Sequence, residues 1–229
     1  MKFKYYALKL SLLIIIIFIL QLVFPGFTEM FVLNGDSWQE PWRFLTSIFL
    51  HSGVLHLFYN LFALALFGSI LEKFIDNCDN LYNFSRNSLM DNCKNYKLIN
   101  AIIHIGGKKF LIVFLVSGTL ANLISVNFYS SSLGASGAIF GVIGALIVVR
   151  PFMVVWAFSL PMPLFVAGLL WTIGDILGAY GFLVGNPMDN TGNIAHLSGM
   201  FFGFVFGMLF RKIVKRRLKR DNVSIDEDQ

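Results

Sequence analysis

Four polar side chains lie within otherwise apolar stretches of this chain, and their types suit acyl-transfer chemistry. Ser136 follows a small-residue turn that leads into an apolar segment, and His196 lies in the last apolar segment. A hydroxyl and an imidazole that meet can act as nucleophile and general base. His56 and Asn60 are spaced so that, on one helix face, both can donate to a single acceptor, as oxyanion-stabilising groups do.

Each of these residues also has a simpler interpretation. A serine at a helix N-terminus commonly caps the free amides of the first turn. A single histidine within a membrane segment is commonly a structural side chain. His51 and His56 together suggest a metal site, but their spacing splays the rings and no third ligand is evident, so we expect neither a metal nor another cofactor. We expect His51 to tie the preceding loop to the helix.

Composition places the chain among polytopic helical membrane proteins. Its 229 residues are 56% hydrophobic and 14% charged, with a mean hydropathy of +0.70, values well above those of a soluble domain. The basic residues flank apolar runs, which indicates orientation signals and argues against a nucleic-acid partner. Cys78 and Cys93 are too few for a disulfide framework and lack metal-ligand spacing.

The apolar stretches predict an all-α bundle of six transmembrane helices in a single membrane domain over 1–229. Lys2, Lys4 and Lys9 give the first stretch the look of a signal peptide, but no small-residue cleavage site follows, so it is retained as a helix. We expect a mixed loop at 25–52 and an irregular segment at Pro151–Pro163. A polar extramembrane insert is expected at about 76–107, and a basic tail with an acidic end at 211–229. The predicted helices are 6–24, 53–71, 110–128, 135–149, 163–183 and 194–210.

Six spans put both termini, the insert and Arg150 on one side of the membrane. That side then carries 17 of the 18 Lys and Arg residues, with Arg43 alone opposite. The positive-inside rule therefore predicts that both termini are cytoplasmic.

The same topology predicts that the polar side chains share one depth. Ser136 lies 14 residues from Arg150, or about 21 Å along a helix. His196 lies 15 residues from Arg211, or about 22 Å, and His56 and Asn60 bracket that level. Glycines at close helical spacing would let the fourth and sixth helices approach. These are Gly137, Gly141 and Gly144 on one helix and Gly199, Gly203 and Gly207 on the other.

In several motifs the chain resembles the rhomboid family of intramembrane serine proteases. The residues that carry the resemblance are Trp42-Arg43, His51-x4-His56-x3-Asn60 with Glu72, Gly134-x-Ser136-Gly137, and Ala195-His196-x2-Gly199-x3-Gly203. The resemblance implies a Ser136–His196 dyad, an oxyanion hole of His56, Asn60 and the Ser136 amide, and supporting roles for His51, Trp42, Arg43, Glu72, Gly134 and Gly199. It also implies substrates that are transmembrane segments of other proteins, water entry from the outer face, and a fifth helix that acts as a mobile gate.

The chain departs from the family pattern at several positions. Family members often carry a tyrosine where this chain has Phe140, so we expect a looser His196. The insert is longer than usual, and its simplest interpretation is a disordered polar loop. Asp175 is the one carboxylate that could complete a triad. The resemblance implies a dyad, so we expect Asp175 to serve packing or capping and Asp175→Asn to keep most activity.

Two other functions compete with proteolysis. One is a non-proteolytic rhomboid-like protein that binds membrane helices, although such relatives lack the serine or the histidine. The other is a small transporter, which would predict an internal repeat that the sequence does not show. Because no organelle transit peptide precedes the first helix, we expect a prokaryotic cell membrane, with lipid around the bundle; the sequence leaves the oligomeric state and the natural substrate open.

Overall fold

The structure, a computed structural model, describes residues 6–72, 107–185 and 192–220. Almost all of the predicted insert and the acidic end of the tail lie outside these residues. Long helices occupy all six predicted apolar stretches, which confirms the all-α bundle. They are α1 (Tyr6–Val23), α4 (Val54–Ala63) continued by the π-helical η3 (Leu64–Gly68) to Glu72, α7 (Gly107–Ser125), α8 (Ser136–Val149), α9 (Leu164–Leu183) and α10 (Asn193–Arg220).

Four of these helices are long and apolar enough to cross a membrane: α1, the helix from Val54 to Glu72, α9, and the Asn193–Lys212 part of α10. The apolar parts of α7 and α8 are shorter. Large apolar side chains on the outer helices point away from the protein, as Leu22 on α1 and Leu177 on α9 do. Such faces suit lipid, so the bundle is a polytopic membrane protein.

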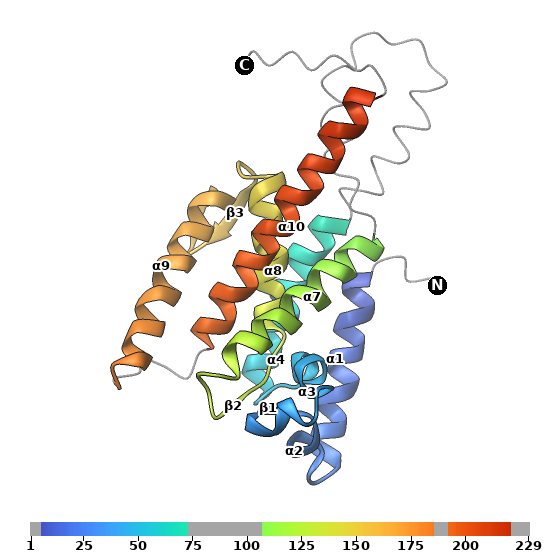
Figure 1. Ribbon diagram of the computed structural model, residues 1–229, viewed down its shortest axis with the longest axis vertical. Coiled ribbons are helices and arrows are strands. Elements are labelled where there is room, and N and C mark those ends of the chain that lie inside the picture. Colours follow the sequence, from blue (N-terminus) through green and yellow to red (C-terminus); the bar gives the residue numbers. More distant parts are fainter. Residues whose placement is uncertain (1–5, 73–106, 186–191, 221–229) are drawn as a thin grey trace.

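Helix α8 forms the centre of the bundle. It is apolar on all sides, and its residues from Gly137 to Leu146 are buried except Phe140, which is half-buried. A helix that is apolar all round is a core helix. Figure 1 shows α8 behind α10, with α1 and α9 at opposite edges of the bundle. Residues at the first turn of α8 are therefore enclosed by other helices.

Glycines bring α8 and α10 into backbone contact, as the sequence predicted. A Cβ built on Gly199 would lie 2.0 Å from the Gly137 carbonyl oxygen, and one built on Gly203 would lie 1.8 Å from that of Gly141. Real carbon atoms do not approach oxygen so closely, so only glycine permits this helix spacing. The contact fixes the relative height of the two helices.

The segment between α1 and α4 is more ordered than the predicted mixed loop. It contains α2 (Phe27–Phe31), β1 (Leu33–Asn34), the 3-10 helix η1 (Gly35–Trp38), α3 (Arg43–Thr46) and the 3-10 helix η2 (Ser47–Phe49), and β1 pairs with β2 (Ser131–Ser132). Arg43 organises it: its guanidinium donates to the carbonyls of Glu29 at 2.6 Å and Val32 at 3.0 Å, and pairs with Glu40. One buried arginine therefore satisfies several carbonyls that no helix would satisfy.

The expectation of an irregular segment at Pro151–Pro163 is wrong. Strands β3 (Val154–Ala157) and β4 (Leu160–Pro163) form an antiparallel hairpin. Its two-residue turn, Phe158-Ser159, has positive φ angles of 52° and 63°, as a turn matched to the strand twist requires. Val155 and Ala157 pack into the main core. The prolines had suggested an irregular chain, but the segment is a hairpin whose first strand alternates exposed and buried side chains.

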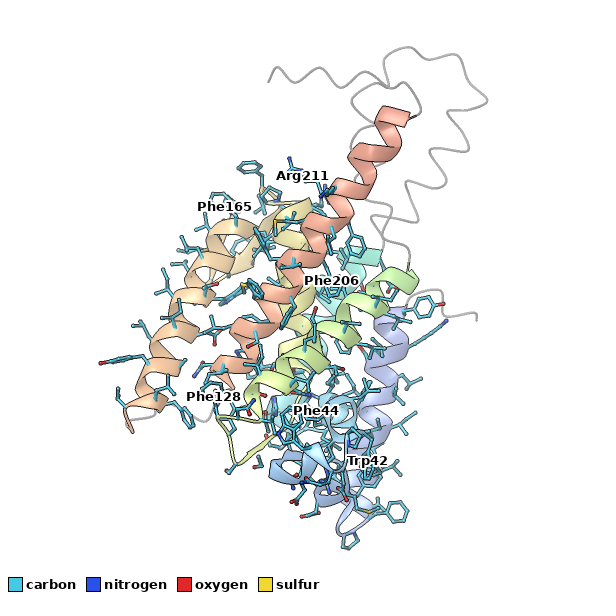
Figure 2. The ribbon with its side chains drawn as sticks, viewed as in Figure 1. Trp42, Phe44, Phe128, Phe165, Phe206 and Arg211 are labelled. Carbon is cyan, nitrogen blue, oxygen red and sulfur yellow. The ribbon has the colours of Figure 1, made fainter. Side chains whose placement is uncertain are left out.

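Glu72 ties the second membrane helix to the start of the first. Its carboxylate accepts the backbone N–H groups of Tyr6 at 2.7 Å and Ala7 at 2.8 Å. These are orphan donors of the first turn of α1, and a negative charge is favourable there. Glu72 therefore holds the end of the bundle opposite to Trp42 and the short helices, which Figure 2 shows at the far end from Arg211.

Candidate functional site

Ser136 is the first residue of α8, but it does not cap the helix. Ala135 occupies the N-cap position, and no side-chain hydrogen bond caps the helix there. The capping interpretation is therefore wrong, and the hydroxyl is available for another role. The preceding turn depends on Gly134, whose φ of 129° disfavours any other residue. The Gly134 amide donates to the Ser47 carbonyl at 2.9 Å, which anchors the turn to η2.

His196 lies in the first turn of α10, and a residue of α8 packs on its ring. The ring of Phe140 stacks on the imidazole with centroids 4.3 Å apart and planes 6° apart. Phe140 is one turn below Ser136 on α8, so the same helix presents both side chains. The stack needs only the ring and no hydroxyl; that His196 is held more loosely than beside a tyrosine stays a prediction.

The structure places Ser136 and His196 at the facing ends of the glycine-packed helices. A Cβ on Gly137, the next residue after Ser136, would lie 3.3 Å from the carbonyl oxygen of Ala195, the residue before His196. Among the described residues, no hydrogen bond joins the Ser136 hydroxyl to the imidazole. Hydrogen bonds between catalytic groups are often long before substrate binds and tighten in the complex.

His56 points at the Ser136 turn. A Cβ on Gly134 would lie 2.9 Å from His56 Nε2 and 4.0 Å from Ser136 Oγ, so all three groups border one small space. On the far side of the ring, His56 Nδ1 lies 3.4 Å from the Ser52 amide, which donates to it, and 3.0 Å from the Ser52 hydroxyl. An Nδ1 that accepts leaves the proton on Nε2. The imidazole therefore presents an N–H donor beside Ser136.

Asn60 is buried one turn along the same helix. Its amide nitrogen donates to the His56 carbonyl at 2.9 Å, which fixes the side chain against its own helix. An amide has two N–H groups, so one donor remains for a ligand. His56 and Asn60 thus lie on one face, as their spacing predicted.

His51 precedes the helix and joins three parts of the structure. Its backbone exchanges hydrogen bonds with the Gln21 side chain of α1, at 3.0 and 3.2 Å. Its ring lies 5.0 Å from the ring of His56, although helical geometry had predicted that the two would point apart. The helix begins only at Val54, so helical geometry does not apply to His51.

We expected Asp175 to serve packing or capping, but the structure places it beside His196. Its carboxylate lies 3.0 Å from His196 Nδ1, and both residues are buried. The sequence offered one signal for this contact, a carboxylate within a membrane span, which normally has a partner. Ser52, whose contact with His56 carries no signal in the sequence, lies four residues before His56 and just outside the helix.

Together these residues could carry acyl transfer. A hydroxyl stands at a helix N-terminus, where free amides and the helix dipole favour developing negative charge. An imidazole faces it across a close helix contact, and a second imidazole offers an N–H donor beside it. Two partners, Phe140 and Asp175, hold the first imidazole.

Comparison with known proteins gives a consistent result. A model of the Rhomboid domain matches residues 38–92 and 95–213. The rhomboid protease GluP of Bacillus subtilis is 32% identical over 71% of this chain and 25% of its own length. RHOMBOID-like protein 7 of Arabidopsis thaliana is 29% identical over 75% and 43%. The chain thus spans less than half of these two relatives. The rhomboid protease GlpG of Haemophilus influenzae is 24% identical over 93% of this chain and 94% of its own.

Proposed function

Since this chain belongs to the rhomboid family, we propose that it is an intramembrane serine endopeptidase with Ser136 as nucleophile and His196 as general base. The observation that carries the proposal is the pairing of an uncapped Ser136 at the start of α8 with a buried His196 that stacks on Phe140 of that helix. Relatives named rhomboid proteases support the reaction class.

In the first half of the reaction, Ser136 Oγ attacks the carbonyl carbon of a substrate peptide bond as His196 Nε2 takes the hydroxyl proton. The carbonyl oxygen becomes an oxyanion beside the His56 N–H, the second Asn60 N–H and the amide of Ser136. Loss of one such donor typically costs about a hundredfold to a thousandfold in rate. The imidazolium then gives its proton to the leaving amine, and water hydrolyses the acyl-enzyme by the same steps.

The substrate under this proposal is a transmembrane segment of another protein, cut near its outer end. Trp42 and Arg211 lie at opposite ends of the bundle in Figure 2, which supports an outer face at the short helices and a cytoplasmic face at the end of α10. Ser136 is on the side of the short helices, because its turn contacts η2 and β2 pairs with β1. The site then opens outward, both termini are cytoplasmic, and the protein resides in a cell membrane.

The test uses the purified full-length protein in lipid vesicles, a fluorophosphonate probe and a model transmembrane substrate. Wild-type protein should label and cleave, and Ser136→Ala and His196→Ala should do neither. Ser198→Ala is a matched control, because this hydroxyl only donates to the Ile194 carbonyl within α10, so it should keep full activity.

A wild-type protein that neither labels nor cleaves would refute the protease. It would favour the alternative of a non-proteolytic rhomboid-like protein that binds membrane helices. One relative, 27% identical over 54% of this chain, is named inactive RHOMBOID-like protein 8, and that name is the observation in favour of this alternative.

A further inference from the structure

A carboxylate lies where a membrane bundle rarely places one. Asp175 is on α9, is 7% exposed, and accepts a hydrogen bond of 3.0 Å from His196 Nδ1. Burying an ionised carboxylate costs several kcal/mol unless a partner compensates. The imidazole is that partner, and the contact joins α9 to the residue proposed as general base.

Neighbouring contacts show that helix register produces this pairing. One helical turn from the Asp175–His196 pair, on the side of Arg211, the Thr172 hydroxyl contacts Met200 Sδ at 3.2 Å. One turn the other way, Asn193 lies against Gly178, where a Cβ would be 2.4 Å from the Asn193 amide nitrogen. Antiparallel helices in one register give such successive pairs. Gly178 lets α9 approach α10, and Asp175 then lies opposite His196.

We propose that Asp175 is a positioning residue that makes His196 part of a Ser–His–Asp arrangement; this inference rests on the proposed protease function. An ionised carboxylate only accepts hydrogen bonds, so His196 Nδ1 must carry the ring proton. Nε2 then keeps its lone pair, and this nitrogen is the one required to take the Ser136 proton. Without the carboxylate, the ring is free to adopt the other tautomer, in which Nε2 is protonated and cannot act as a base.

Asp175 and Phe140 restrain the imidazole in different directions. The parallel stack on Phe140 fixes the plane of the ring. The bond from Nδ1 to Asp175 fixes its rotation within that plane. Phe140 alone leaves the second motion free, so the carboxylate supplies what the stack cannot.

The proton balance follows directly. When Ser136 Oγ bonds to the substrate carbon, its proton moves to His196 Nε2 and the ring becomes a cation. Asp175 keeps its negative charge and stabilises that cation. Collapse of the tetrahedral intermediate breaks the C–N bond and sends the same proton to the leaving nitrogen. The neutral Nε2–H form of His56 adds no opposing positive charge to this site.

The experiment compares Asp175→Asn with Thr172→Val in the vesicle assay. The asparagine keeps the shape and loses the charge, so kcat should fall about a hundredfold while KM stays within threefold; fluorophosphonate labelling should slow by a similar factor. Thr172→Val removes the neighbouring α9–α10 contact and should lower the Tm but leave kcat within threefold. Asp175→Glu, which restores a carboxylate, should recover at least tenfold over Asp175→Asn.

Several results would overturn the proposal. One is an Asp175→Asn protein with wild-type kcat and labelling, and another is an Asp175→Glu protein no faster than Asp175→Asn. If neither variant folds while Thr172→Val does, Asp175 is a structural residue only. These outcomes differ from failure of the protease function, in which wild-type protein itself neither labels nor cleaves.

Discussion

The contact between Gly199 and the Gly137 carbonyl makes a sharp prediction for Gly199→Ala. A Cβ at this position would lie 2.0 Å from the carbonyl oxygen, whereas a carbon and an oxygen in van der Waals contact need at least about 3 Å. The oxygen belongs to backbone, so no side chain can move aside. Helices α8 and α10 must therefore separate by about 1 Å beside Ser136.

That separation acts on the distance between Ser136 and His196, because one residue is on each helix. A displacement of about 1 Å within a catalytic group can cost about a hundredfold in rate, which corresponds to about 2.7 kcal/mol of transition-state stabilisation. We expect kcat/KM for a fluorescent transmembrane substrate to fall by about this factor. Circular dichroism should still show a folded helical protein, with a lowered Tm.

Gly174→Ala is the matched control. Gly174 lies within α9 and has open space around its Cβ position, so alanine should be accepted and cleavage should stay within twofold of wild type. The reasoning would be refuted by a Gly199→Ala protein that cleaves within threefold of wild type, or by an equal loss in Gly174→Ala.

Two further predictions concern stability. Glu72→Gln should lower the Tm and reduce the free energy of unfolding by about 1 to 3 kcal/mol, because the charge is lost and one N–H of the first turn of α1 loses its acceptor; cleavage should change less than threefold, and an unchanged Tm would contradict the role. Burial first, and then the neighbouring His56, lower the pKa of His51 from 6.5 to about 4, although a bond to the Phe49 carbonyl opposes this. The imidazole of the unfolded chain therefore takes up a proton at higher pH than that of the folded chain. The contribution of His51 to the free energy of unfolding is complete above pH 6.5 and declines as pH falls toward 4. His51→Phe should flatten the Tm profile in that range, and parallel profiles for the two proteins would refute the assignment.

The helices could be predicted from the sequence because apolar length alone defines them. The expected stretch 135–149 is α8 almost residue for residue, and the expected 6–24 is α1. The approach of α8 and α10 was also predictable, because glycines at helical spacing have few other reasons to occur on both helices. These properties depend on neighbours along one helix.

The contact of Asp175 with His196 could not be predicted in this way. It depends on how far α9 slides along α10, and that register is set by the fit of Asn193 against Gly178. Side-chain fit between helices leaves no periodic signal in the sequence. The prediction that the rings of His51 and His56 point apart was wrong for a related reason. The position of His51 relative to His56 depends on where the helix begins.

The prolines of the β3–β4 hairpin affect the outer edge of β4, which faces away from β3. A two-residue turn makes Ala157 and Leu160 a hydrogen-bonded pair, so in the observed register Pro161 and Pro163 both have their nitrogen directed away from β3. Proline has no N–H, so at both positions the outer edge of β4 has no backbone donor for the carbonyl of another strand. Chain-to-chain sheet growth is thereby blocked on that side, and no N–H at these positions is left without a partner where water is scarce.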